Sequence, residues 1–185
     1  MSYKGGMSLR HAILGFLAHC PMTGYDLKRH MARSVSHFWP ADQAQIYRTL
    51  SGLVADGLVA VETEEQTAKP NRQVHSIRPE GLAELDRWLA EPIGITPSRE
   101  PFLMRLFFVG RLGAGGVRAL LAARIAEAEA LLSALDEVRA EAQQAAETGL
   151  EGRLRLATQE NGAAHARAER DWAAALLNEI GEQDG

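Results

Sequence analysis

The chain has 185 residues, of which 46% are hydrophobic and 24% charged, and its 20 Lys and Arg against 24 Asp and Glu give a formal net charge of -4. This length suits one or two small globular domains, and the apolar fraction excludes a disordered chain. No run approaches the roughly 18 apolar residues of a membrane span, so we expect no membrane partner.

Two helices are predicted near the N-terminus. The first extends from Ser8, a possible N-cap, to His19, because its apolar residues recur at three- and four-residue spacing. The second runs from Thr23 to about Arg33, with Asp26 at the position that completes a capping box.

A third helix is predicted after Trp39. Pro40 has the backbone angle that suits a first helical position, and Asp42 places negative charge in the first turn. Gly57 is expected to end this helix as its C-cap.

A β-hairpin is predicted next. Leu58 to Thr63 and Val74 to Ile77 are candidate strands, and the polar residues between them form the tip. A fourth helix opens at Pro79 and stops before Pro92. This order of elements is that of a winged helix-turn-helix domain, which we assign to residues 1–91.

The rest of the chain is predicted to be helical, so the fold is mainly α with a small β-hairpin wing. After a linker at 92–101, helices are expected at 102–111, 114–147 and 151–180. The long middle helix carries a coiled-coil-like seam of apolar residues at Val117, Leu121, Ile125, Ala128, Leu132 and Leu135. A helix of this length needs a partner along it, so we expect residues 102–185 to form an antiparallel helical domain that joins two copies of the chain in a homodimer.

Polar side chains interrupt one stripe of the last predicted helix. Thr158, Asn161 and His165 share it with Trp172 and with Leu154, Ala168 and Ala175. Polar groups on a seam can fix the register of a dimer or face a cavity. Register is the interpretation we favour.

The charge is unevenly distributed. Residues 1–50 hold six basic and two acidic side chains. Residues 51–92 hold four basic and eight acidic side chains, and residues 93–185 hold ten basic and fourteen acidic ones. A basic section in an acidic chain is a reason to consider nucleic acid as a partner.

The third predicted helix has two unlike faces. Ile46, Leu50 and neighbouring apolar residues fall on one arc, while the opposite arc presents small residues around Gln45 and Arg48. Small residues permit close approach of a helix to DNA, and Gln and Arg can bond to adenine and guanine edges in the major groove. An ordinary solvated face is the competing interpretation of this helix taken alone, and its place before a hairpin favours DNA recognition.

Further candidates for DNA contact lie on the second helix and at the wing tip, where basic side chains can reach phosphates. A solvated, charged surface is again the alternative for any one of them. The full set of predicted DNA-binding residues is Lys28, Arg29, Gln43, Gln45, Tyr47, Arg48, Ser51, Lys69, Asn71 and Arg72.

Enzymatic and metal chemistry are not indicated. Cys20 is the only cysteine, which excludes an internal disulfide and a Cys-x-x-Cys pair and fits a reducing compartment. The histidine spacings do not match a two-ligand helix pair, and the glycines at 113–116 follow a helix and not a strand. We therefore expect no metal, no cofactor and no enzymatic activity, and, without a signal-like apolar segment, a cytoplasmic location.

The motifs resemble those of the winged-helix domain of PadR-family transcriptional regulators. They are the sequence from Gln45 to Leu50, the run Asp56-Gly57-Leu58-Val59, the wing residues Pro70-Asn71-Arg72 and the upstream Thr23-Gly24-Tyr25-Asp26-Leu27. Beyond the linker, the sequence from Glu100 to Phe108 and the closing Asp171-Trp172 resemble the helical C-terminal domain of the longer, virulence-activator-like branch. This chain departs from the family pattern at His75 and at Arg78-Pro79.

The resemblance implies a dimeric regulator of transcription, usually a repressor, whose affinity for its operator falls when a small aromatic or hydrophobic effector binds. No family motif identifies effector residues, so the candidates are aromatic side chains suited to a planar ligand, namely Phe38, Trp39, Trp88 and Trp172. Packing in the core is the competing role for each. A winged-helix module that binds protein without specific DNA binding is the alternative function.

Overall fold

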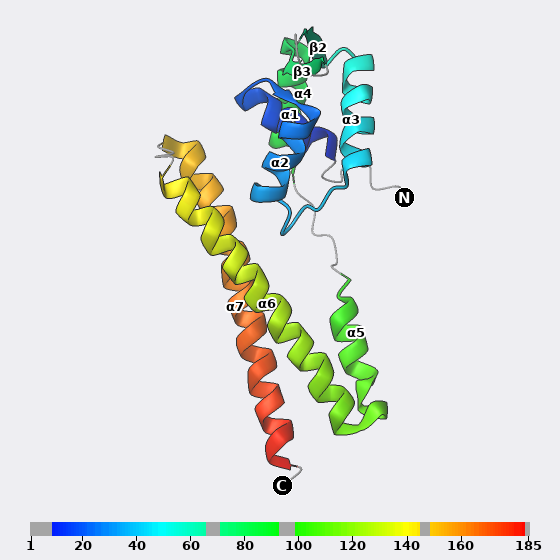
Figure 1. Ribbon diagram of the computed structural model, residues 1–185, viewed down its shortest axis with the longest axis vertical. Coiled ribbons are helices and arrows are strands. Elements are labelled where there is room, and N and C mark those ends of the chain that lie inside the picture. The colour runs from blue at the N-terminus through cyan, green and yellow to red at the C-terminus, as the bar shows by residue number, and fades with distance from the viewer. Residues whose placement is uncertain (1–8, 66–70, 93–98, 145–148, 184–185) are drawn as a thin grey trace. The chain divides into compact units, whose positions relative to one another are not determined.

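The structure, a computed structural model, describes residues 9–65, 71–92, 99–144 and 149–183. It divides the chain into two compact units, Met1–Ile95 and Thr96–Gly185 (Figure 1). The predicted N-cap at Ser8 and the predicted DNA contact at Lys69 lie outside the described residues.

Four helices enclose the core of the first unit: α1 (Leu9–His19), α2 (Gly24–Ser34), α3 (Gln43–Ala55) and α4 (Pro79–Ala90). Each contributes apolar side chains at helical spacing, and these side chains lose nearly all contact with solvent, which is the main stabilising contribution to such a domain. The most deeply buried members of the core are Ile13, Leu14, Leu17, Leu27, Ile46, Leu50, Leu53 and Val59.

Helix α2 begins as the sequence predicts. The Thr23 hydroxyl accepts a hydrogen bond from the backbone N–H of Asp26 at 3.1 Å and donates one to the Asp26 carboxylate at 2.7 Å. Asp26 thus closes the N-terminus of the helix in the position expected of a capping-box residue.

Helix α3 begins at Gln43, three residues after Pro40, so the predicted start of this helix is wrong. Asp42 is the N-cap, and its carboxylate accepts from the backbone N–H of Gln45 at 2.7 Å. The Gln45 side chain accepts in return from the backbone of Asp42, so a complete capping box competes with the proline signal and determines the start. The C-cap of α3 is Asp56 and not the predicted Gly57, which follows it with a φ of 72°.

The sheet has three antiparallel strands and not the two that the sequence predicts. β2 (Val59–Glu64) and β3 (Arg72–Ile77) form the wing, with Val59 opposite Ile77 and Glu64 opposite Arg72. The short β1 (Met22–Thr23) pairs with the other edge of β3, so that the strand order is β1-β3-β2. His75 is buried in the central strand, and this burial lowers its pKa.

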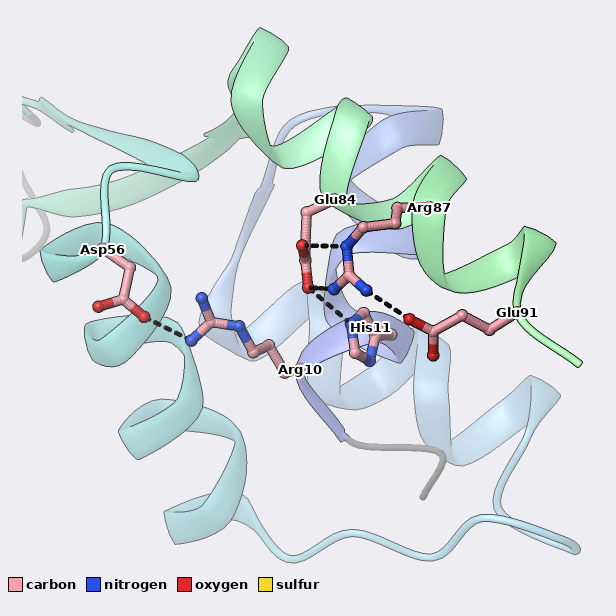
Figure 2. Close-up of polar contacts among 6 residues, drawn as sticks. All are labelled: Arg10, His11, Asp56, Glu84, Arg87 and Glu91. Carbon is pink, nitrogen blue, oxygen red and sulfur yellow. Dashed lines mark hydrogen bonds and ion pairs between the residues drawn. The ribbon is translucent and has the colours of Figure 1, made fainter. Parts of the chain in front are cut away.

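Polar contacts fix α1 against the helices on either side of it (Figure 2). Arg10 forms an ion pair of 2.5 Å with Asp56 at the end of α3, and the His11 ring lies 3.2 Å from the Glu84 carboxylate of α4. Glu84 also pairs with Arg87, which reaches on to Glu91. Arg10 and His11 thus link α1 to the end of α3 and to α4.

From Pro101 on, the described residues of the second unit are helical: α5 (Pro101–Phe108), η1 (Val109–Leu112), α6 (Gly113–Gln144) and α7 (Gly149–Gln183). The predicted helix at 102–111 is wrong at its end, because a 3₁₀ turn takes over at Val109 and Gly113 adopts a φ of 70°. Helices α6 and α7 run alongside each other (Figure 1). The α6 seam is buried at Leu121, Ala128 and Leu135.

Helix α7 packs on α6 through a stripe other than the one singled out in the sequence. Its buried positions are Gly152, Gln159, Ala163, Ala166 and Ala173. Thr158, Asn161 and His165 are exposed. The polar stripe therefore lies outside the α6–α7 contact and is available to another molecule.

Large apolar side chains remain exposed on this unit. They are Leu103, Met104, Phe107, Phe108, Leu112, Leu150, Leu154 and Trp172, and Phe107 is 82% exposed. By length and composition the helical stretch Pro101–Ala140 could also cross a membrane. The positive φ of Gly113 bends that stretch, and α6 buries its seam on α7, so an interface with another protein surface is the better account of these side chains.

Candidate nucleic-acid interface

Helix α3 buries one face and presents the other to solvent. Ile46, Leu50 and Leu53 pack into the core with at most 1% of their surface exposed. Since they lie on one side of the helix, the residues between them are directed away from the domain. The exposed side chains include those of Gln43, Ala44, Gln45, Tyr47, Arg48, Ser51 and Ala55.

Arg48 is the side chain of this face best suited to reading a base. Within the described residues no hydrogen bond or ion pair holds its guanidinium, and it is exposed at the middle of the helix. Nearby, the Ser51 hydroxyl donates to the Tyr47 backbone carbonyl at 3.1 Å. The donors of Arg48 are therefore free to form the bidentate contact that arginine makes with guanine.

The two glutamines of the predicted set already have structural partners. Gln45 completes the capping box of α3. The Gln43 side-chain carbonyl accepts from the Lys28 ammonium at 2.8 Å, a link between α2 and α3. Lys28 and Gln43 are thus brought together, next to the exposed Arg29 on α2.

Tyr47 is 42% exposed, and its ring lies against Gly24 at the start of α2. A β-carbon at position 24 would lie 2.7 Å from the ring carbon Cε1. The absence of a side chain at Gly24 thus leaves room for the tyrosine at the border of the α3 face.

The wing residues meet α2. The Arg72 guanidinium donates to the Asp26 carboxylate at 3.1 Å, and Asn71 is exposed beside it. The hydrogen bond from the Thr23 hydroxyl, with the positive charges of Arg72 and Arg29, keeps the pKa of Asp26 below its usual range. Asp26, predicted only as a capping residue, therefore also ties the tip end of β3 in the wing to α2.

The predicted effector residues have separate neighbours within their own units. Trp88 stacks on His11 with ring centres 4.8 Å apart, Phe38 packs edge-on against His37, and Trp172 in the second unit packs edge-on against Phe102. Trp39 lines a cavity in the first unit.

That cavity lies beside α3 and has a volume of about 430 Å³. The lining residues are Leu9, Trp39, Pro40, Ala41, Gln45, Arg48 and Thr49. They come from the start of α1, the segment before α3 and the first two turns of α3, three separate parts of the sequence. No spacing pattern in the sequence could therefore have predicted this cavity. The described residues contain no group of three or more His, Cys, Asp or Glu that could hold a metal ion.

Comparison with known proteins matches both units. Residues 13–87 match the PadR-like family of transcriptional regulators, and residues 98–181 match the C-terminal domain of virulence activator alpha. A probable transcriptional regulator of Mycobacterium tuberculosis is 42% identical over 90 residues, which are 49% of this chain and 48% of that protein. The alignment thus spans about half of that relative's length.

The Bacillus subtilis negative transcriptional regulator PadR is 30% identical over 129 residues, 69% of this chain and 70% of that protein. Its structure in complex with operator DNA has the same fold, with a TM-score of 0.81 at 22% identity over 93% of this chain and 98% of that one. Its structure with p-coumaric acid gives a TM-score of 0.75 at 21% identity, over 94% and 95% of the two chains. The chain belongs to the PadR-like family of transcriptional regulators.

Proposed function

We propose that this protein is a sequence-specific DNA-binding repressor that acts as a homodimer in the cytoplasm and has no enzymatic activity of its own. The observation that carries the proposal is the exposed face of α3, where Arg48 projects among small residues while the opposite face is buried in the core. Such a helix can enter a major groove closely enough for side chains to reach base edges.

The neighbouring elements support the same mode of binding. Lys28 and Arg29 on α2, together with Asn71 and Arg72 at the wing, would contact the backbone on either side of α3, and Lys69 would join them from the sequence of the wing tip. Such contacts set the position of the protein on the duplex, while α3 supplies the specificity. The fold of the chain is that of the Bacillus protein that was solved on its operator.

The dimer is assigned to the second unit. Its exposed Phe107, Phe108 and Leu112 and the exposed stripe of α7 are surfaces that a second copy would cover. Thr158, Asn161 and His165 would then fix the register between subunits. A two-fold dimer would present two α3 helices to half-sites about one DNA turn apart, roughly 34 Å.

Release from DNA is assigned to a small aromatic or hydrophobic effector. The Bacillus relative binds p-coumaric acid, a planar aromatic acid. In this chain an effector that alters the separation or the freedom of the two α3 helices would weaken the binding to both half-sites together.

A protein-binding module would present a different α3 face. Such surfaces carry large exposed apolar groups, whereas the exposed positions of α3 are small, polar or basic apart from Tyr47 at its border. The structure therefore favours DNA over a protein partner for this helix.

The test is a fluorescence-anisotropy titration of the whole protein with the duplex upstream of its own reading frame and with a scrambled duplex of equal length. We expect the upstream duplex to bind at least about a thousandfold more tightly. Raising the salt concentration from 50 to 200 mM should lower the affinity for both duplexes by about tenfold or more, because phosphate contacts release counterions. Equal affinity for the two duplexes would overturn specific recognition.

A further inference from the structure

One carboxylate lies among the basic side chains assigned to the DNA backbone. Asp26, in the first turn of α2, accepts a hydrogen bond from the Arg72 guanidinium at the tip end of β3. We propose that Asp26 is a specificity-determining residue, which holds Arg72 so that the wing contacts a phosphate only on a duplex that α3 also fits. The proposal rests on the proposed function, because it takes Arg72 to contact the DNA backbone and α3 to read the bases.

The Asp26 carboxylate is itself held in place. Its oxygen Oδ2 accepts from the Thr23 hydroxyl at 2.7 Å and from Nη2 of Arg72 at 3.1 Å. The side chain of Asp26 is 25% exposed, against 48% for that of Arg72. The hydrogen bond from Thr23 and the charge of Arg72 lower the pKa of Asp26, so the carboxylate is ionised at neutral pH. Arg72 is thus tied to a charged group that is anchored on a helix.

The contact with Asp26 leaves Arg72 with donors to spare. A guanidinium carries N–H donors on three nitrogen atoms, and this contact uses Nη2. Within the described ranges no other hydrogen bond or ion pair engages Arg72. Nε and Nη1 therefore remain available to the oxygens of a phosphate, in a direction that Asp26 sets.

Helix α2 has in turn a fixed position relative to α3. The Lys28 ammonium of α2 donates to the side-chain carbonyl of Gln43 at 2.8 Å. The Tyr47 ring of α3 lies so close to Gly24 that a β-carbon there would be 2.7 Å from Cε1. Through Asp26, Arg72 therefore has a defined place relative to α3, although it belongs to the wing.

This placement affects how well the protein distinguishes duplexes. A long side chain with free rotamers can reach phosphates in many poses on DNA, including those in which α3 is not seated in the major groove. A guanidinium held in one place meets a phosphate only when α3 is seated, and it then loses less conformational freedom on binding. A phosphate contact carries no sequence information by itself, but here it favours the operator.

The test is the ratio of the Kd for scrambled duplex to the Kd for operator, measured on the whole protein at one salt concentration. Asp26→Asn keeps the shape of the side chain and removes the charge that holds Arg72. We expect it to lower the ratio by about two- to tenfold, because Arg72 must then be immobilised when the operator binds. Circular dichroism checks that the variant is folded.

Glu64→Gln is the matched control. Glu64 is exposed opposite Arg72 in the strand register, and in the described part of the chain no hydrogen bond or ion pair joins the two side chains. The substitution removes the same charge from the wing, so it should raise the affinity for both duplexes alike and preserve the ratio.

A double-mutant cycle then asks whether Asp26 acts through Arg72. In an Arg72→Ala protein, Asp26→Asn should leave the ratio unchanged. An unchanged ratio in Asp26→Asn alone, an equal fall in Glu64→Gln, or the same fall with and without Arg72 would each overturn the proposal. Failure of the proposed function would look different, since the wild-type protein would then bind both duplexes with equal affinity, and this proposal would fall with it.

Discussion

Gly81, in the first turn of α4, is a residue whose replacement meets a severe steric conflict. A β-carbon there would lie 2.4 Å from the backbone oxygen of Leu58 and 2.8 Å from a side-chain carbon of Ile77. Because a backbone oxygen cannot move aside cheaply, we expect Gly81→Ala to lower the free energy of unfolding by about 1–3 kcal/mol. Urea unfolding of the variant measures this.

The matched control is Gly15→Ala in α1. Apart from its chain neighbours and the backbone of its own helix, no atom lies within 4 Å of the position its β-carbon would take, and alanine favours the helix over glycine. This substitution should raise the free energy of unfolding by up to about 1 kcal/mol. A Gly81→Ala protein as stable as the Gly15→Ala protein would show that α4 does not pack as closely as the structure indicates.

Asp26 makes the first unit sensitive to acid. Its pKa is lowered in the folded state by the Thr23 hydrogen bond and by the charges of Arg72 and Arg29. A lowered pKa means that the folded protein binds the proton less readily than the unfolded chain, whose value is near 3.8. The stabilisation is thus fully present above that value and is lost as the pH falls through the lower folded pKa.

We therefore expect the stability advantage of the wild-type protein over Asp26→Asn to be constant between pH 6 and 7 and to shrink towards pH 3. Urea unfolding at each pH measures the difference. Thr23→Val, which removes the largest cause of the shift, should reduce the pH dependence while leaving the carboxylate in place. A difference in unfolding free energy between the wild-type protein and Asp26→Asn that is as large at pH 3 as at pH 7 would contradict this account.

At the scale of the element, the start of α3 depends on Asp42. Its carboxylate satisfies an N–H of the first turn that would otherwise have no intrahelical partner. Asp42→Ala should therefore lower the free energy of unfolding by about 1 kcal/mol, and Asp42→Asn, which retains an accepting oxygen, by much less. Equal losses for the two substitutions in urea unfolding would show that the cap does not define the start of the helix.

The elements also show how far a sequence predicts this fold. Periodic apolar residues predicted each long helix, because burial of one face leaves a regular pattern. β1 was missed because two residues are too few to show any alternation. The predicted start of α3 was wrong because Pro40 and Asp42 are both signals for a helix N-terminus. The hydrogen bonds of the capping box make Asp42 the N-cap.

The candidate site was predictable in part for the same reason. The exposed face of α3 follows from the position of its buried residues, so Arg48 could be singled out from the sequence. The ion pair between Arg72 and Asp26 and the cavity beside Trp39 join residues far apart in the chain. Such contacts depend on tertiary packing, which leaves no periodic signal.

At the scale of the whole molecule, the surface of the second unit should control the oligomeric state. Phe107 and Phe108 are exposed in the single chain, and burial of their rings between subunits would contribute several kcal/mol. We expect the wild-type protein to elute as a dimer at micromolar concentration and the Phe107→Ser, Phe108→Ser double variant to elute as a monomer. Gel filtration with light scattering gives both masses.

The control for this prediction is Leu89→Ser, which removes an exposed apolar side chain from α4 of the first unit. It should leave the dimer intact. A double variant that still elutes as a dimer would assign the interface to other residues of the second unit. Elution of the wild-type protein as a monomer would show that it does not form a dimer at this concentration.

The uneven charge of the chain fits the assignment of DNA binding to the first unit and of dimerisation to the second. The basic section 1–50 contains α2 and α3, whereas residues 93–185 carry an excess of acidic side chains. Repulsion from phosphate would keep the acidic helices off the DNA, so that binding is confined to the first unit and weakens as salt increases.

The central claim is that α3 reads sequence through Arg48, and one measurement tests it most directly. It is the ratio of the Kd for scrambled duplex to the Kd for operator, determined at one salt concentration for the wild-type protein and for Arg48→Ala. Loss of a base contact worth about 1–3 kcal/mol should lower this ratio by about five- to a hundredfold. Arg29→Ala, assigned to phosphate, should weaken both duplexes alike and preserve the ratio. An unchanged ratio in Arg48→Ala would contradict the account.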